Sequence, residues 1–370
     1  MDGKIYIYQQ DNWPNFIWDI RKLSTLLAEV RNNQGRLIGK METLGFDLQN
    51  EAFLETLTAD VLKTNEIEGI IINKEEVRSS IARRLGIDIG GLPSINRDIE
   101  GIVDMMFDAT NNFDKPLTKK RLFDWHSALF PTGRSGMYEI IVGNWRDDSA
   151  GPMQVVSGAM GKERIHYQAP TAEEIDKEIT IFLNWFNSKT DMDLVLKASI
   201  AHLWFVTLHP FEDGNGRIAR AITDMLLARS DGLSQRFYSM SAQIQKERKS
   251  YYDILENTQK GKLDITGWIH WFLQTLQKAI LNSEKTLAIV IKKHRFWNTY
   301  GTKIKNERQK KILNGLLDGF TGDLTTSKWA KITKCSQDTA LRDIQDLIDK
   351  GILIKSSSGG RSTKYELKDE

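Results

Sequence analysis

Two long apolar segments joined by a short loop dominate the middle of this sequence. The segment "LVLKASIAHLWFVTL" (residues 194–208) is apolar on almost every face, which is typical of a helix buried within a protein core. The segment "GRIARAITDMLLARSDG" predicts a second helix, which ends at Gly232 because glycine readily adopts the left-handed cap conformation. Only "HPFEDGN" (residues 209–215) lies between them. A chain with this feature must build its core around two helices.

Helical patterns also dominate the rest of the chain. Residues 50–85 carry apolar side chains at three- and four-residue spacing, which predicts amphipathic helix. Strand signals are sparse and lie mainly in "KERIHYQAP" (residues 162–170) and in "GILIKSSSGGRSTKYEL" (residues 351–367), where two alternating runs flank a Ser/Gly turn. We therefore expect a mainly α fold, a helical bundle with a small β-hairpin.

Two breaks in the pattern suggest three regions. Glycine and proline interrupt the helices in "GLPSINRD" (residues 91–98), and a stretch rich in Lys, Arg and Asn lies around residues 292–309. We expect an amino-terminal helical region at residues 1–92, a core at residues 93–285 and a carboxyl-terminal domain at residues 305–370.

The carboxyl-terminal domain has the element order of a winged helix-turn-helix. Residues 324–355 predict a helix, a turn and a second helix, and a hairpin follows; such a second helix often enters a DNA groove. That helix, "SQDTALRDIQDLIDK", holds one Arg against four Asp, which suits phosphate binding poorly. DNA binding through residues 305–370 and a role in protein contact or dimerisation both remain open.

The composition is that of a globular protein. The 370 residues are 40% hydrophobic and 27% charged, with a formal net charge of +2, so charge alone does not indicate a polyanion partner. A single cysteine, Cys335, provides no internal disulfide and fits a reducing compartment. The amino terminus shows no secretory signal, and the most apolar segment is too short to span a bilayer. We expect a cytoplasmic protein that does not enter the membrane.

The loop ahead of the second helix has the composition of a phosphate-binding site. Gly214, Asn215 and Gly216 precede the helix, so their backbone N–H groups can form an anion-binding nest. Glycine permits the positive φ that such a nest requires. Arg217 and Arg220 are three residues apart and share a helix face, from which both guanidinium groups can reach outer phosphates.

The same loop offers a metal ligand and a base. Asp213 supplies a hard oxygen for Mg²⁺, which one or two carboxylates usually hold together with phosphate oxygens. His209 has an ordinary pKa near 6.5, so it is largely neutral at cellular pH and can accept a hydroxyl proton. Phe211 is the expected buried anchor of the loop. A loop that only joined two helices would need none of this set.

The stretch "HPFEDGNGRIAR" (residues 209–220) resembles the signature of the Fic family, H-x-F-x-(D/E)-G-N-G-R-x-x-R, at every specified position. The resemblance implies an α-helical Fic fold and transfer of AMP from ATP, with Mg²⁺, onto a hydroxyl side chain of a target protein or of the chain itself. It assigns the general base to His209, the Mg²⁺ ligand to Asp213, the phosphate cradle to Gly214–Gly216 and the β- and γ-phosphate contacts to Arg217 and Arg220.

One glycine in this motif bears on the reaction type. A phosphate-transferring branch of the family commonly carries lysine at the position of Gly216. Glycine leaves that space open for the outer phosphates, so the α-phosphate would lie at the metal and His209. This favours nucleotidyl transfer over phosphoryl transfer.

Upstream, "TNEIEG" (residues 64–69) resembles the inhibitory motif of the family, (S/T)-x-x-x-E-(G/N). Thr64 and Glu68 are four residues apart and share a helix face, and Gly69 completes the motif. If Glu68 pairs with Arg220, the γ-phosphate loses its partner. The alternative is that Glu68 is an ordinary solvated helix residue.

Further residues are assigned from their positions relative to the motif. Family members are thought to align target peptides along a β-hairpin flap, and "RIHYQAP" stands in the matching place. Nucleoside contacts are expected from "ERKSYYDILENTQKG" (residues 247–261). Thus the flap residues are Ile165, His166, Tyr167 and Gln168, and the nucleoside contacts are Tyr251 and Gln259. The alternatives are a hairpin without a partner and tyrosines that belong to the core, while His126 and His202 are expected to be structural.

These observations lead to one main hypothesis and two alternatives. The main one is a protein adenylyltransferase autoinhibited by Glu68. One alternative is removal of AMP from modified proteins at the same site. The other is a DNA-binding regulator in which the Fic core acts as a sensor. The segments "YQQDNWPNFIWDI" and "VRSSIARRLG" resemble the helical region ahead of many bacterial Fic cores, and homodimerisation is an expectation from the resemblance.

Overall fold

The computed structural model describes residues 6–87, 97–158, 162, 164–304, 306–317, 320, 322–356 and 363–368. The chain divides into two compact units, Met1–Glu284 and Lys285–Glu370. The predicted amino-terminal region and the predicted core therefore lie in one compact unit. The boundary expected at residues 91–98 lies outside the described residues, except for Arg97 and Asp98.

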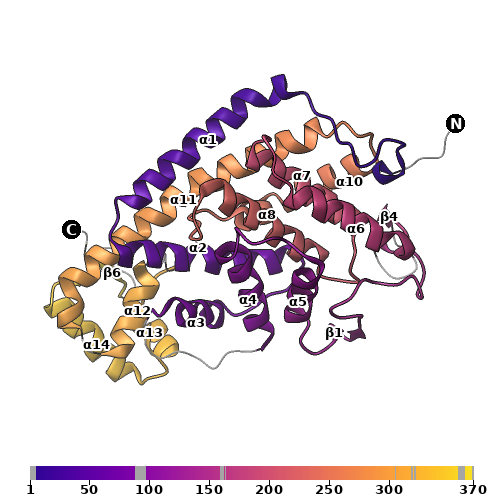
Figure 1. Cartoon of the computed structure of the whole chain (residues 1–370). Coiled ribbons are helices and arrows are strands. Elements are labelled where there is room, and N and C mark those ends of the chain that lie inside the picture. The colour runs from indigo at the N-terminus through magenta and orange to yellow at the C-terminus, as the bar shows by residue number, and fades with distance from the viewer. Residues whose placement is uncertain are drawn as a thin grey trace. The chain divides into compact units, whose positions relative to one another are not determined.

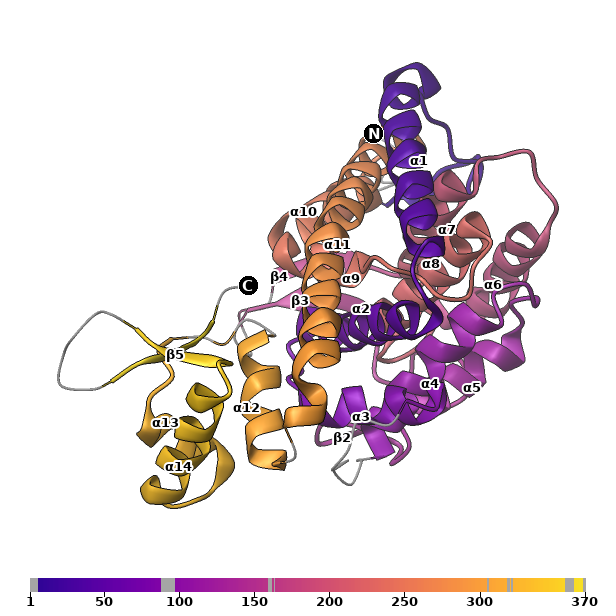
Figure 2. The ribbon, with the colours of Figure 1, turned by 90° about the vertical axis from the view of Figure 1, so that its left-hand side faces the viewer.

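The first unit is built from helices, as the sequence predicts (Figures 1 and 2). They are η1 (Ile7–Gln9), α1 (Ile20–Glu42), α2 (Phe46–Ile67), α3 (Lys74–Leu85), α4 (Arg97–Asn111), α5 (Lys119–Leu129), α6 (Ala172–Asn187), α7 (Leu194–Leu208), α8 (Asn215–Asp231), α9 (Met240–Lys246), α10 (Arg248–Gln259) and α11 (Thr266–Tyr300), which continues into the second unit. Its short strands are β1 (Arg134–Ser135), β2 (Tyr138–Glu139), β3 (Gln154–Ser157) and β4 (Arg164–Gln168). The strands form two antiparallel hairpins, β1–β2 and β3–β4. The expected mainly α fold is confirmed.

Helix α7 is buried along its length, from Val195 to Leu208, and α8 packs against it. This burial follows from a helix that is apolar on all faces. The polar residues within α7 have partners. Lys197 Nζ donates to Ser188 O over 2.9 Å, and His202 lies 2.9 Å from Thr223 Oγ1 and 2.8 Å from Tyr251 Oη. The segment can therefore form a core helix despite its two titratable residues.

A buried cluster of charges joins α2 to α8. The guanidinium of Arg236 contacts the carboxylate of Asp224 in α8, and Ser239 Oγ donates to Asp60 Oδ1 in α2 over 2.5 Å. Asp60, Asp224 and Arg236 are all almost inaccessible to solvent. Burial, together with the nearby charge of Asp224, raises the pKa of Asp60 to about 7. The contact of α2 with the start of α9 thus includes a carboxyl group that resists ionisation.

The β3–β4 hairpin carries the residues expected to form a flap. Its register pairs Gln154 with Gln168 and Val155 with Tyr167, and a bulge follows on the β4 side. The Tyr167 side chain is buried, and its hydroxyl donates to Thr207 O in α7 over 2.7 Å. The hairpin is therefore fixed to the end of α7, next to the loop that begins at His209.

The second unit contains the end of α11, then η2 (Gly301–Lys303), α12 (Glu307–Leu317), α13 (Thr326–Thr333), α14 (Gln337–Asp349) and the antiparallel strands β5 (Leu353–Lys355) and β6 (Tyr365–Leu367). Its core includes Ile312, Trp329 and Leu347. The order matches the sequence-based expectation for this region, while its assignment as a winged helix remains a prediction.

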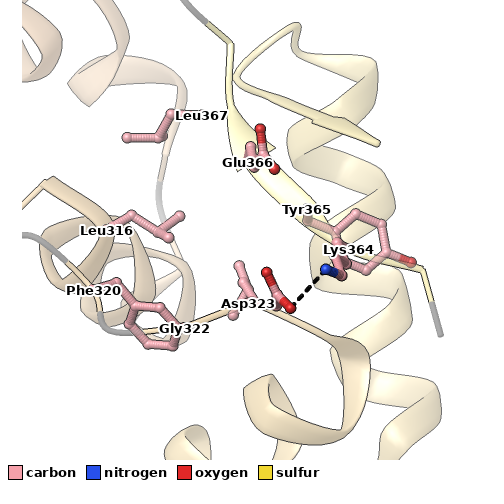
Figure 3. A pocket seen from close by; sticks show the side chains of 9 residues that line it. Leu316, Phe320, Gly322, Asp323, Lys364, Tyr365, Glu366 and Leu367 are labelled. Atoms are coloured by element: carbon pink, nitrogen blue, oxygen red, sulfur yellow. Dashed lines mark ion pairs between the residues drawn. The ribbon is translucent and has the colours of Figure 1, made fainter. Parts of the chain in front are cut away.

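A cavity of about 270 Å³ lies in the second unit beside β6 (Figure 3). Leu316, Phe320 and Leu367 contribute apolar side chains to its lining. At its rim, Lys364 Nζ and Asp323 Oδ2 form an ion pair of 2.8 Å. All residues that line the cavity belong to the second unit.

Candidate active site

Two residues of the motif, one at each end of the loop between α7 and α8, adopt a left-handed backbone conformation. His209 ends α7 in a left-handed conformation, with φ of +49°, and Gly214 precedes α8 with φ of +81°. Asn215 accepts from Phe211 N over 3.0 Å and donates to Phe211 O over 2.7 Å. Phe211 is fully buried, and its ring stacks on His126 at 4.2 Å. The motif therefore fixes its own backbone before any ligand binds.

The tautomer of His209 follows from one contact. His209 Nδ1 lies 3.2 Å from Val206 O, and because a carbonyl only accepts hydrogen bonds, Nδ1 carries the proton. The lone pair is then on Nε2. Burial lowers the pKa of His209, against the opposing effect of the Val206 carbonyl. The side chain is thus a neutral imidazole with a free basic nitrogen, as proton abstraction requires.

The carboxylate of Asp213 is held from two sides. Ser135 Oγ in β1 donates to Asp213 Oδ2 over 2.5 Å, and Gly214 N donates to Oδ1 over 2.6 Å. His126 Nε2 donates to Asp213 O over 3.2 Å, while His126 Nδ1 accepts from Gly143 N. Burial lowers the pKa of His126 to about 4, so this bridge is neutral. The Asp213 carboxylate is therefore held in one orientation next to the start of α8.

Two arginines of the motif keep unused donors at the site. Arg217 and Arg220 are buried, and Arg217 Nη2 is 3.5 Å from Asp213 Oδ2, which is a weak contact. Within the described part of the chain, Arg217 Nε and Arg220 Nη1 are buried without a hydrogen-bond partner. Buried donors are almost always satisfied in folded proteins, so these two guanidinium nitrogens are candidate donors to an anionic ligand.

The other side of the Arg220 guanidinium is occupied by α2. Arg220 Nη2 donates to Glu68 Oε1 over 2.6 Å and to Thr64 O over 2.9 Å, and Arg220 Nε donates to Thr64 Oγ1 over 2.6 Å. The ion pair expected between Glu68 and Arg220 is therefore present, and Thr64 adds two further contacts. A cation at these last carbonyls of α2 also suits the negative end of the helix dipole.

The two glycines at this contact have distinct structural roles. At Gly216, an added Cβ would lie 2.4 Å from Glu68 Oε1, so the carboxylate occupies the space directly over this α-carbon. Gly69 has φ of +82°, and Ile70 N donates to Asn65 O over 3.0 Å. This left-handed cap ends α2 immediately after Glu68, and glycine adopts it at low cost.

The end of α2 has a further clamp that the sequence did not reveal. Arg248 Nε, at the start of α10, donates to Ile67 O over 2.6 Å, and Tyr252 Oη lies 3.4 Å from the same oxygen. The guanidinium of Arg248 also lies over the Tyr252 ring at 5.3 Å. This pair stabilises the carbonyl end of the helix that carries Glu68.

The flap residues differ in what they offer to a ligand. Ile165 and its cross-strand partner Val156 are exposed, which leaves an apolar spot on the hairpin. His166 Nδ1 lies 2.5 Å from Glu256 Oε2 and His166 Nε2 lies 2.5 Å from Ser157 Oγ, so its ring is engaged at both nitrogens. Gln168 Oε1 accepts from the side chain of its partner Gln154 over 3.0 Å. Tyr167, buried against α7, anchors the hairpin and does not face a ligand.

The two residues expected to contact the nucleoside are buried in this structure. Tyr251 is 2% exposed, and its hydroxyl is 2.8 Å from His202 Nε2 within the core. Gln259 is 5% exposed and donates to Thr207 Oγ1 over 3.3 Å. Both residues face inward from α10 toward α7, because the apolar side of α10 packs on the bundle. Gln259 thus supports the end of α7, and the assignment of both residues as nucleoside contacts stays a prediction.

The described residues place two limits on metal binding and membrane insertion. They contain no group of three or more His, Cys, Asp or Glu residues placed to hold a metal ion. An Mg²⁺ ion at Asp213 would therefore need phosphate oxygens or water as its other ligands, which is the usual arrangement for this ion in nucleotide sites. In the same ranges, no helix is both long and apolar enough to cross a membrane.

Comparisons with known proteins give related results for different parts of the chain. A family model described as the Fic/DOC family matches residues 116–227, and one described as a domain of unknown function (DUF4172) matches residues 6–87. A protein adenylyltransferase of Nematostella vectensis is 30% identical over 113 residues, which cover 30% of this chain and 25% of that protein. A probable protein adenylyltransferase of Aquifex aeolicus is 27% identical over 97 residues, or 26% of this chain and 28% of that protein.

The match thus spans about a quarter of the length of these curated relatives. Among solved structures, a Fic family protein from Desulfovibrio desulfuricans G20 covers 94% of this chain and 96% of its own, with a TM-score of 0.54 at 18% identity. That likeness concerns the fold. The complete motif at residues 209–220 lies within the matched range, so residues 116–227 form a domain of the Fic/DOC family.

Proposed function

We propose that this protein is an adenylyltransferase that moves AMP from ATP onto a hydroxyl side chain of a target protein and that Glu68 holds it inactive. One observation supports the proposal most. The same motif holds a basic nitrogen, His209 Nε2, and buried donors on Arg217 and Arg220 that have no partner among the described residues. A proton acceptor beside an anion site is the combination that nucleotidyl transfer requires.

The proposed step transfers AMP to the oxygen of the target hydroxyl and releases pyrophosphate. His209 Nε2 takes the proton of the target hydroxyl while its oxygen bonds to the α-phosphorus. The bond from that phosphorus to the bridging oxygen breaks, and pyrophosphate leaves. When bound, Mg²⁺ supplies positive charge to the phosphates, and Asp213 would hold it. The N–H groups at the start of α8 have no partner within the helix, so they are available to phosphate oxygens.

The proposed inhibition is a competition for Arg220. In this conformation Glu68 uses Arg220 Nη2 and fills the space over Gly216, where an outer phosphate would otherwise lie. Two unit charges ~4 Å apart in an effective dielectric of ~20 attract by about 4 kcal/mol. A net preference of only ~1.4 kcal/mol changes the population of a binding mode tenfold. Glu68 can therefore keep the triphosphate out of its productive position.

The test uses ATP labelled at either the α- or the γ-phosphate. We expect Glu68→Gly to label protein from the α-position alone, and Glu68→Gly/His209→Ala to lose the label. Glu66→Gly is the matched control, since Glu66 lies on the same last turn of α2 but pairs with Lys63 at 2.7 Å. Label from the γ-position, or equal rates for wild type and Glu68→Gly, would contradict the proposal.

Removal of AMP from modified proteins is a second candidate function. The Glu68 side chain is 29% exposed beside the phosphate space, so its carboxylate can hold a water molecule for attack on an AMP–protein bond. The two functions respond in opposite directions to one substitution. Glu68→Gly should increase transfer of AMP but decrease its removal, and both are measured with the same labelled target.

A further inference from the structure

A buried arginine outside the motif contacts the backbone of the loop that begins at His209. Arg146 lies between β2 and β3, and its side chain is 0% exposed. Arg146 Nε donates to His209 O over 2.8 Å, and Arg146 N donates to Pro210 O over 3.0 Å. One residue thus holds two consecutive carbonyls at the start of the loop.

The rest of the guanidinium ties this loop to neighbouring segments. Arg146 Nη1 donates to Asp148 Oδ1 over 2.7 Å, and Arg146 Nη2 contacts Pro170 O, just after β4. Asp148 Oδ2 in turn accepts from Ala172 N at the start of α6 over 2.7 Å. A planar guanidinium has several donors in a fixed geometry, so it can join three segments in a way that an ammonium group cannot.

The backbone that Arg146 holds is an unfavourable one. His209 has φ of +49°, a left-handed conformation that is uncommon for a residue with a side chain and persists only where its surroundings enforce it. This conformation turns the chain out of α7 and so determines where the imidazole points. Without the bond to its carbonyl, His209 would be free to relax toward a commoner conformation.

We propose that Arg146 is the positioning residue of His209 and that its guanidinium locks the left-handed turn which aims the imidazole. The inference rests on the proposed transfer reaction. It adds a residue that touches neither nucleotide nor target and whose loss would affect the chemical step more than ATP binding, because the phosphate donors of Arg217 and Arg220 are on a different segment.

The positive charge of Arg146 has a second effect, on the pKa of His209. The charged groups that affect His209 are Arg146, which lowers its pKa, and Glu68 and Asp213, which raise it, while burial has the largest effect. Removing the positive charge should therefore raise the pKa of His209. A lysine at position 146 would keep the charge but lose the fixed set of donors. The two substitutions thus separate the geometric effect from the electrostatic one.

The experiment uses the full chain in the Glu68→Gly background. Arg146→Met and Arg146→Lys should each lower kcat by ten- to a hundredfold, with KM for ATP changed less than threefold. The acid limb of the pH–rate profile should move to higher pH for Arg146→Met alone. Arg84→Lys is the control, since Arg84 pairs with Asp104 on a remote surface. An unchanged kcat in both variants, with the parent active, would overturn the inference.

A readout that does not depend on turnover completes the test. The ring signals of His209 in a ¹⁵N-histidine-labelled chain report both its tautomer and its pKa. We expect Arg146→Met to raise that pKa and to mix the tautomers, and Asp148→Asn to produce a smaller change if Arg146→Met fails to fold. Unchanged ring signals in a folded variant would reject the positioning role. An inactive Glu68→Gly parent would instead refute the proposed function and leave this measurement valid.

Discussion

The carboxylate of Glu68 lies so close to Gly216 that a methyl group on that α-carbon would be 2.4 Å from Glu68 Oε1. An anionic group of the chain itself therefore already occupies the amino-terminal end of α8, where a helix attracts negative charge. The Arg220 Nη1 atom is 3.2 Å from the same hypothetical methyl, so Glu68, Gly216 and Arg220 enclose one small space. The lack of a side chain at Gly216 serves both the inhibited state and the proposed phosphate-bound state.

This close approach predicts a coupling between two substitutions. Gly216→Ala should destabilise the wild type by about 1–3 kcal/mol, the usual cost of overpacking, because the methyl must displace Glu68. In the Glu68→Gly background the same change should be neutral or slightly stabilising, because alanine favours helix over glycine. Thermal melting of the four proteins measures the coupling. Equal effects of Gly216→Ala in both backgrounds would show that Glu68 does not fill this space in solution.

Thr64 provides a second prediction about the same contact. Thr64 Oγ1 accepts from Arg220 Nε over 2.6 Å, and Thr64→Val removes this bond while keeping the shape of the side chain. A hydrogen bond to a charged group contributes about 1.5–3 kcal/mol, so the variant should transfer AMP several-fold faster than wild type but more slowly than Glu68→Gly. Thr58→Val is the control, since Thr58 Oγ1 bonds to Leu54 O in its own helix.

The parts of the site that the sequence predicted are those encoded locally. Residues 209–220 form one loop and one helical turn, so their spacing in sequence nearly determines their spacing in space. The Glu68–Arg220 pair was also expected, through a second short motif that the resemblance supplied. Helical periodicity then gave the mainly α fold, because apolar residues that repeat every three or four positions must face a core.

The parts that the sequence did not predict depend on contacts between distant segments. Ser135 is 78 residues from Asp213, and Arg248 is 181 residues from Ile67. A single serine or arginine carries no local sequence pattern that identifies a partner so far along the chain. The burial of Tyr251 and Gln259 was not predicted, for a related reason. Periodicity tells which residues share a face of α10, but it does not tell whether that face meets a ligand or the core.

Ser135 leads to a prediction about the metal. Its hydroxyl donates to Asp213 Oδ2 over 2.5 Å and so fixes the carboxylate that is proposed to hold Mg²⁺. In the Glu68→Gly background, Ser135→Ala should raise the Mg²⁺ concentration for half-maximal transfer by about ten- to a hundredfold, the usual effect of losing a group that orients a ligand. Ser149→Ala is the control, since Ser149 bonds to the exposed Asp147. A Mg²⁺ requirement equal to that of the parent would exclude this role for Ser135.

Protonation of Asp60 makes the packing of α2 depend on pH. The pKa of Asp60 is raised to about 7 by burial and by the charge of Asp224, from an ordinary value of 3.8. Between these two values the folded chain binds a proton that the unfolded chain has released. The free energy of unfolding should therefore decrease, by a few kcal/mol, as the pH rises from about 4 to about 7, and then level off. Above pH 7 Asp60 is ionised close to the charges of Asp224 and Arg236.

Other buried groups titrate in the opposite sense, so the raw pH profile is a mixture. Burial lowers the pKa of His126 to about 4 and that of His202 to about 3. The free energy of unfolding therefore decreases as the pH falls below about 6.5, because the unfolded chain then binds protons that the folded chain does not. The comparison of wild type with Asp60→Asn cancels these effects. The variant should gain thermal stability over wild type as the pH rises from 5 to 8, because asparagine keeps the shape of the side chain without the charge. A difference in melting temperature that stays constant over this range would mean that Asp60 does not titrate there. Because Asp60 lies one turn ahead of Thr64 on α2, the same pH change should also loosen the contact of that helix with Arg220.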